Sequence, residues 1–212
     1  MDHLEIFKEV VTTEEEIREM LGYPSERAIK KVISKLDSHC RHYLSLSPFA
    51  LLSSSNANGI CDVSPRGDAP GFVHIIDDKH IIIPERQGNK RIDSITNILS
   101  NPHVGLIFLI PGLKETLRIN GKACVIKDQE ILQQMAVNER VPLLGIGIQI
   151  EECFVQCAKA LIRSQLWDQD TWADKESLPS IPHMMAAHVN DSNLTSKKME
   201  ESLQESYTKR LY

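Results

Sequence analysis

The chain has 212 residues, of which 42% are hydrophobic and 25% charged, and a formal net charge of −5. This composition is that of an ordinary globular protein and excludes a collagen-like repeat or a wholly disordered chain. The negative balance argues against a general nucleic-acid coat protein, so any bound anion must be held by a local group of donors. The length favours one domain with appended helices.

The sequence carries no sign of export. Acids stand among the first five residues, where a signal peptide needs a basic start followed by an apolar run. The longest apolar run, residues 104–110, is too short to span a membrane and stops at Pro111. The five cysteines are an odd number without a CxxC pair, which is typical of reduced thiols. We therefore expect a cytoplasmic protein that binds neither membrane nor nucleic acid.

Two helices are expected at the N-terminus, within a region of helices packed on the barrel that we bound at residues 1–45. Thr13 and Glu16 have the spacing of a capping box. A second helix begins near Ser25, and its apolar residues keep helical spacing as far as Leu36. Its other face is basic: Arg27, Lys30, Lys31 and Lys35. Solvation explains such a face, and phosphate binding is the alternative.

From residue 49 the hydrophobic period becomes that of a strand, and a barrel domain is expected over residues 46–180. The predicted strand segments are 49–52, 60–63, 72–76, 80–83, 104–110, 116–126 and most of 148–161. Short helices are predicted at 92–99 and 128–137, and a docking helix in the tail at 181–212. About six strands with few helices between them favour a small antiparallel barrel over a Rossmann sheet.

A basic pair, Lys90 and Arg91, stands at the start of the helix predicted over 92–99. Asn89 is a suitable N-cap, which would place both cations in the first turn, where the helix dipole disfavours them. A bound phosphate would reverse that penalty. The alternative is a solvated turn whose charge Glu85 and Asp93 partly offset.

A second polar group, Ser64 and Arg66, lies in a segment expected between two strands. Its hydroxyl and guanidinium could donate to a phosphate or to a ring carbonyl, and an ordinary polar turn is the alternative. The histidines are dispersed and no thiolates are paired, so no metal site has support. The sequence contains no P-loop, GxSxG or GxGxxG motif.

Six segments of the chain resemble the pyridoxamine 5′-phosphate oxidase-like family of FMN-binding split barrels, and in particular a bacterial branch described as FMN-dependent enzymes. They read VSPRGDAPGF (63–72), IPERQGNKRIDS (83–94), NPHVGLIF (101–108), ETLRING (115–121), CAKA (157–160) and RSQLWD (163–168). The similarity covers most of residues 25–180 and leaves the final tail unmatched.

The resemblance implies a mainly β protein with flanking helices, built on a six-stranded antiparallel split barrel. The interior of so small a barrel is filled by side chains, so the family binds FMN outside it, at the interface of a homodimer. Ten residues are expected to bind the cofactor: Ser64, Arg66, Asn89, Lys90, Arg91, Thr116, Arg118, Lys159, Arg163 and Trp167.

The resemblance implies that different residues bind different parts of the cofactor. The phosphate is assigned to Arg66, Lys90 and Arg91. The flavin ring is assigned to Thr116, two residues before Arg118. The final group, Lys159, Arg163 and Trp167, is expected to reach the partner's flavin, although a core or interface role is the alternative for the tryptophan.

The function implied is an FMN-dependent oxidoreductase acting on a small molecule, with no catalytic side chain assigned. Vitamin B6 oxidation is not expected, because Thr116 stands where true pyridoxamine phosphate oxidases carry glutamine, and their final substrate motif is not found in this tail. One alternative is a split barrel that binds flavin, haem or deazaflavin without turnover. A structural or regulatory protein that binds no flavin is another.

Overall fold

The computed structural model describes residues 6–191 and 193–212. The acids that argue against a signal peptide lie among residues 1–5, outside the described residues. The chain divides into two compact units, one ending at Val32 and the other beginning at Ile33. Among the described residues, no helix has the length and apolar character needed to cross a membrane.

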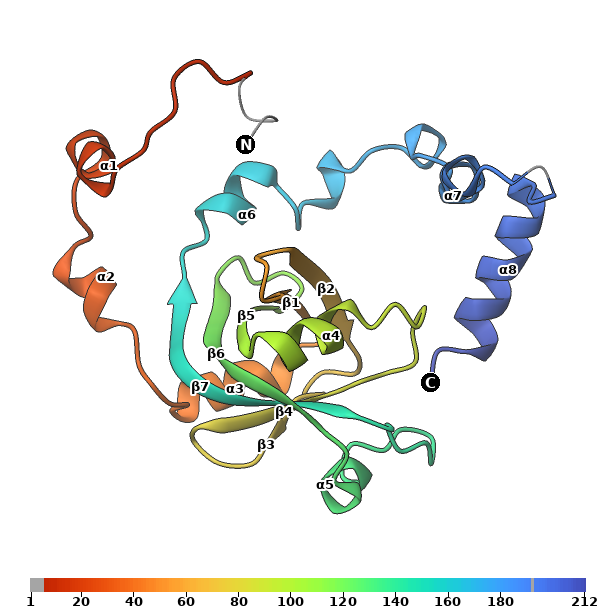
Figure 1. The fold of residues 1–212 in the computed structure, drawn as a ribbon, viewed down its shortest axis with the longest axis horizontal. Coiled ribbons are helices and arrows are strands. Elements are labelled where there is room, and N and C mark those ends of the chain that lie inside the picture. Colours follow the sequence, from red (N-terminus) through yellow and green to blue (C-terminus); the bar gives the residue numbers. More distant parts are fainter. Residues whose placement is uncertain (1–5, 192) are drawn as a thin grey trace. The chain divides into compact units, whose positions relative to one another are not determined.

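The first unit contains α1 (Glu14–Leu21) and α2 (Glu26–Lys30) (Figure 1). The hydroxyl of Thr13 accepts a hydrogen bond from the N–H of Glu16 at 3.3 Å, so the predicted cap is confirmed. The second helix was expected to reach Leu36, and this is wrong, because Ile33 instead forms a β-bridge with Cys153. A β-branched residue is a weak helix former, and a tertiary partner for its backbone outweighs local propensity.

The second unit is built on one sheet with the strand order β2-β1-β5-β6-β7-β4-β3, in which all neighbours are antiparallel. The strands are β1 (Phe49–Ser55), β2 (Cys61–Gly67), β3 (His74–Ile75), β4 (His80–Pro84), β5 (His103–Leu109), β6 (Thr116–Ile126) and β7 (Gly145–Gln156). The expected class, a mainly antiparallel split barrel with flanking helices, is confirmed. In the part of the chain that the structure describes, the sheet has seven strands and not six, because the two-residue β3 adds to the count.

The last strand differs from its prediction at both ends. Strand pairing begins at Gly145, opposite Ile126, and stops at Gln156. The residues expected to continue the strand to 161 form α6 (Lys159–Ser164) instead. The alternating apolar pattern identified the middle of the strand, whereas its ends depend on where β6 supplies a partner.

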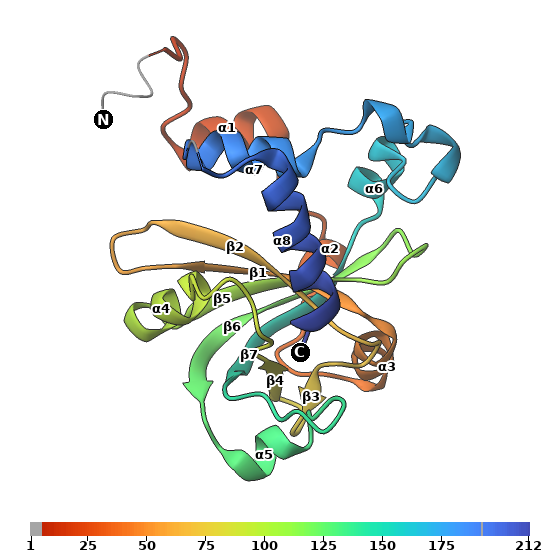
Figure 2. The same cartoon turned by 90° about the vertical axis from the view of Figure 1, so that its right-hand side faces the viewer.

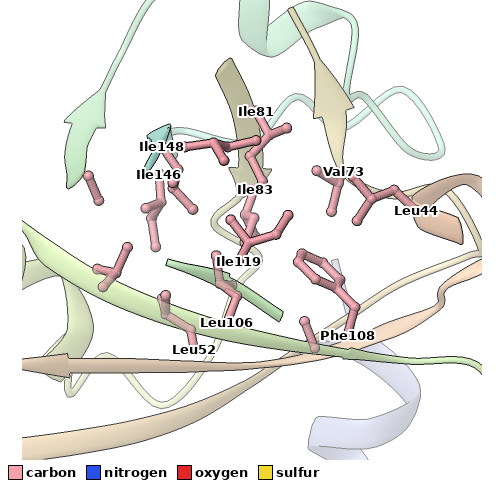
Figure 3. Close-up of a cluster of buried hydrophobic side chains, with 14 of the residues drawn as sticks. Leu44, Leu52, Val73, Ile81, Ile83, Leu106, Phe108, Ile119, Ile146 and Ile148 are labelled. Atoms are coloured by element: carbon pink, nitrogen blue, oxygen red, sulfur yellow. The ribbon is translucent and has the colours of Figure 1, made fainter. Parts of the chain in front are cut away.

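Alternate residues of five strands fill the interior of the barrel. Figure 3 shows the side chains of Leu52, Leu106, Phe108, Ile119, Ile81, Ile83, Ile146 and Ile148 meeting in one cluster. Each of these residues is at most 2% exposed. The interior therefore has no room for a cofactor, and a ligand must bind on the outer surface of the barrel.

Among the described residues of the second unit, six helices accompany the sheet: α3 (Ser38–Leu46), α4 (Asp93–Ser100), α5 (Gln129–Gln133), α6, α7 (Ile181–Val189) and α8 (Ser196–Lys209). The prediction missed α3, whose buried residues Cys40 and Leu44 belong to the core cluster. Two 3₁₀ turns, Gln169–Thr171 and Lys175–Ser177, follow α6. The helix that bears on the candidate site is α4, which packs on β1, β2 and β6 (Figure 2).

Candidate functional site

A surface cavity of about 490 Å³ lies between β2, the start of α4 and residues 85–92, which join β4 to α4. We call it the β2 cavity, and residues 85–92 the 85–92 segment. Four of the ten predicted cofactor residues line it: Ser64, Arg66, Asn89 and Arg91. Its volume is that of an ordinary small-molecule site.

One edge strand supplies a row of polar side chains to this cavity. Asp62, Ser64 and Arg66 alternate along β2 and are half-buried, while their neighbours are exposed. Alternation along a strand places residues two apart on the same face. Ser64 and Arg66 were expected between strands, and this is wrong: both lie within β2. The proline between them is tolerated because β2 pairs on one side only, with β1.

Arg66 is the most constrained cation of the cavity. Its side chain is 13% exposed and its Nη1 donates to a carboxylate oxygen of Glu85 at 2.5 Å. Its Nε is buried and has no hydrogen-bond partner among the described residues. A buried donor left unsatisfied costs about 1–3 kcal/mol. Arg66 therefore has a donor available for an acceptor that the chain itself does not provide.

A carboxylate and two hydroxyl groups in the lining of the cavity form a hydrogen-bonded network. One oxygen of Asp62 accepts hydrogen bonds from Ser64 Oγ at 2.7 Å and from Ser94 Oγ at 2.9 Å. This network ties β2 to the first turn of α4. The hydroxyl of Ser64, predicted to face a ligand, donates to Asp62 in this arrangement.

The basic pair does not lie in the first turn of a helix. Asn89 was expected to be the N-cap, and this is wrong: α4 begins at Asp93, preceded by Ile92, and lacks a side-chain cap. The side chain of Asn89 instead accepts from the N–H of Arg91 at 3.0 Å. Asp93, the first residue of α4, is an acid, and its negative charge interacts favourably with the positive N-terminal end of the helix dipole.

Lys90 and Arg91, the basic pair of the 85–92 segment, line different cavities. Lys90 and Ile92 both have left-handed backbone, with φ of 62° and 53°. Arg91 lines the β2 cavity and its Nε donates to Asp93 at 2.8 Å, whereas Lys90 lines a neighbouring cavity. Left-handed conformation is unfavourable for an isoleucine, so the segment stores strain beside the site.

A contact that the sequence did not predict links this segment to the final residue. Arg86 Nε donates to Asp68 at 2.7 Å, and the hydroxyl of Tyr212 donates to the other oxygen of Asp68 at 2.8 Å. The guanidinium of Arg86 lies 5.7 Å from the centre of the Tyr212 ring. Nothing in the tail sequence signals this contact, because it joins residues 144 positions apart.

Asp68 is held as a carboxylate by this network. Burial raises its pKa, but hydrogen bonds from the N–H of Ala69, from Tyr212 and from Arg86 outweigh burial and leave the pKa below its ordinary value. The same contact raises the pKa of Tyr212, because its hydroxyl donates to Asp68. The network thus favours one charge state: an ionised acid and a neutral phenol.

The remaining predicted residues line neither cavity. Thr116 is buried at the start of β6, and Arg118 stacks on the ring of Phe154 at 5.2 Å. Trp167 Nε1 donates to the carbonyl of Leu113 at 2.9 Å, and α6 exposes two more predicted cations, Lys159 and Arg163.

The sheet register explains this separation. Arg66 lies opposite Ala50, which lies opposite Phe108, which lies opposite Leu117. Three strand spacings separate Arg66 from Leu117, roughly 14 Å along the sheet. Within one chain, the residues predicted to bind the phosphate (the phosphate group) and those predicted to bind the flavin ring (the ring group) therefore do not line one cavity.

The family model for pyridoxamine 5′-phosphate oxidase matches residues 36–157. HupZ of Group A Streptococcus is similar in structure, with 17% identity and a TM-score of 0.45 over 57% of this chain and 93% of that one. An FMN-binding protein from Syntrophomonas wolfei has 13% identity and a TM-score of 0.43 over 68% and 96%. General Stress Protein 26 from Bacillus anthracis has 16% identity and a TM-score of 0.40 over 55% and 93%. No curated protein matches the chain.

Proposed function

Because the chain belongs to the pyridoxamine 5′-phosphate oxidase family, we propose that it binds FMN at the β2 cavity and serves as an FMN-dependent oxidoreductase. The observation that carries this proposal is the buried Nε of Arg66, a donor without a partner among the described residues, in a cavity of small-molecule size. A phosphate oxygen is the acceptor that such a guanidinium binds most strongly.

The phosphate group of FMN would bind between Arg66 and Arg91, with Ser64 and Asn89 beside it. Three guanidinium groups and three carboxylates line the cavity. The phosphate must therefore draw the arginines away from their acids, chiefly Arg66 from Glu85. Bound FMN would supply the redox chemistry, and the chain would orient it and exclude water around its phosphate.

The ring would extend to residues of a second subunit. Thr116, Lys159, Arg163 and Trp167 do not line the β2 cavity of their own chain. A homodimer that pairs the phosphate group of one chain with the ring group of the other would complete the site, leaving one flavin at each of two equivalent sites in its interface.

The first prediction concerns the two partners of the Arg66–Glu85 ion pair. Arg66→Gln is expected to weaken FMN binding by roughly ten- to a hundredfold, because charge-assisted hydrogen bonds contribute about 1.5–3 kcal/mol each. Glu85→Gln removes the competing carboxylate and is expected to tighten FMN binding. Both affinities are measured by titrating flavin fluorescence.

Riboflavin, which lacks the phosphate, is the control ligand and should bind wild type and both variants about equally. Lys90→Gln, on the far side of the segment, is expected to change FMN affinity less than threefold. Equal losses for riboflavin and FMN in Arg66→Gln would show that this arginine does not bind the phosphate.

A flavin-binding protein without turnover is the second candidate. Among the described residues that line the β2 cavity there is no histidine, cysteine or tyrosine. Proton transfer there would depend on carboxylates that are already engaged, Glu85 and Asp93 by arginines and Asp62 by two serine hydroxyls. Reduction of the bound flavin by NADH or NADPH, followed at 450 nm, decides between the two candidates. Mass spectrometry of ligand released by heat distinguishes FMN from haem and deazaflavin.

A further inference from the structure

A second cavity, of about 590 Å³, lies on the other side of the 85–92 segment. We call it the tail cavity, because the final residue, Tyr212, forms part of its wall. The rest of the wall comes from the 85–92 segment, which the two cavities share, and from residues 140–144, which precede β7. We propose that the tail cavity binds a small organic anion with an apolar, ring-sized body, separately from any flavin in the β2 cavity.

The apolar half of the cavity is built by the residues before β7. Val141, Pro142, Leu143 and Leu144 line it in sequence, and Ile92 faces them from the segment. Leu143 is 84% exposed and Ile92 is 58% exposed. Large apolar side chains left open to water at a concave surface are typical of a binding site, because covering them with a ligand makes the free energy of binding more favourable.

The polar half of the cavity is cationic. Arg86, Lys90 and Arg140 line it, against one carboxylate, Glu85. That carboxylate already pairs with Arg66 in the β2 cavity. Arg140 donates to the carbonyl oxygen of Tyr212, and Arg86 pairs with Asp68. Lys90 is the cation of this lining that has no acid partner among the described residues. The charge left for a ligand is therefore positive, which selects an anion.

Three contacts hold Tyr212 in the wall. Its hydroxyl donates to Asp68, its ring lies against Arg86, and its carbonyl accepts from Arg140. A tyrosine ring fixed in this way gives a ligand ring a flat surface at low entropic cost. The volume fits one small molecule and not a protein segment with a stable interface.

The occupant follows from these two halves: a carboxylate, sulfonate or phosphate carried by an aromatic or compact aliphatic body. 2-Naphthoate is a probe of this chemistry, and 2-naphthamide is its matched neutral control, since the two share ring and shape. Isothermal titration calorimetry on the full chain, without added flavin, measures both affinities. We expect 2-naphthoate to bind at least tenfold more tightly than the amide.

Substitution at the exposed Leu143 locates the binding. Leu143→Glu places a carboxylate at the cavity and is expected to weaken 2-naphthoate at least tenfold, whereas Leu143→Lys keeps or increases the affinity. Leu99→Glu, at a leucine that is 75% exposed on α4 and lines neither cavity, is the control and should bind as wild type. Because both leucines are exposed, neither substitution is expected to unfold the chain. Far-ultraviolet circular dichroism checks that each variant is folded.

Three results would overturn the proposal: no binding of 2-naphthoate at millimolar concentration, equal binding of acid and amide, or equal weakening by Leu143→Glu and Leu99→Glu. The proposal does not rest on flavin binding. Arg66→Gln should abolish tight FMN binding and keep 2-naphthoate binding, and Leu143→Glu should do the reverse, so failure of one site is distinguishable from failure of the other.

Discussion

At the scale of single residues, Asp68 connects three distant parts of the second unit. It follows the last residue of β2, pairs with Arg86 of the 85–92 segment and accepts from Tyr212 at the end of the tail. Its side chain is 3% exposed, so its charge needs these partners. Arg86, which lines both the β2 cavity and the tail cavity, is held by this carboxylate.

The pH dependence of stability is expected to report on Asp68. Its pKa is lowered in the folded chain, so its stabilisation is complete above the ordinary carboxyl pKa of about 3.9 and is lost as the pH falls through the lowered value. Asp68→Asn should therefore reduce the free energy of unfolding by about 1–2 kcal/mol at pH 7. Urea denaturation should show this difference narrowing as the pH falls below about 4.

The exposed Asp170 supplies the control, since Asp170→Asn should leave the free energy of unfolding at pH 7 unchanged. A constant difference between wild type and Asp68→Asn across the acid range would mean that packing, and not charge, explains the loss.

At the scale of elements, the register between β6 and β7 shifts at a bulge between Asn120 and Gly121. A Cβ at Gly121 would lie 2.0 Å from the carbonyl oxygen of Gln149. Only glycine permits this approach of two backbones, and the bulge bends the longest pair of strands around the core.

Gly121→Ala is therefore expected to destabilise the chain by at least about 2 kcal/mol, as clashes inside a packed core do. Gly88→Ala is the matched comparison, because nothing lies within 4 Å of its Cβ position and its φ is not left-handed. Thermal unfolding of the two variants, followed by circular dichroism, measures the contrast. Similar melting temperatures for both would show that the strands accommodate the added methyl group.

At the scale of the whole molecule, the proposed flavin site needs two chains. The phosphate group lies on β2 and the 85–92 segment, whereas Thr116 and Trp167 lie at the start of β6 and after α6. A shared site predicts complementation between two defective subunits, and a site within one chain does not.

Co-expressed Arg66→Gln and Trp167→Ala chains test the shared site. Random pairing makes half of the dimers mixed, and each mixed dimer has one intact and one doubly defective site, so about a quarter of all sites should bind FMN tightly. Flavin content per chain, measured by absorbance beside light scattering, gives this fraction. If the mixture holds no more flavin than the two variants purified separately, the site does not cross the interface.

The sequence by itself determined the middle of the main strands and the first helix cap. The alternation of apolar residues predicted β1, β5 and β6, and the capping box predicted the start of α1, because these signals depend on residues a few positions apart. The resemblance to a family identified the fold class and singled out Ser64, Arg66, Asn89 and Arg91, which the structure brings to one cavity.

Only the tertiary structure decided the remaining features. The second helix ends at Lys30 because Ile33 pairs with Cys153, and α4 begins at Asp93 because the 85–92 segment takes left-handed turns that oppose a longer helix. The docking of Tyr212 on Asp68 and Arg86 joins residues far apart in the chain. Contacts of this kind leave no pattern in the local sequence. They form because burial and pairing between distant segments stabilise the folded chain.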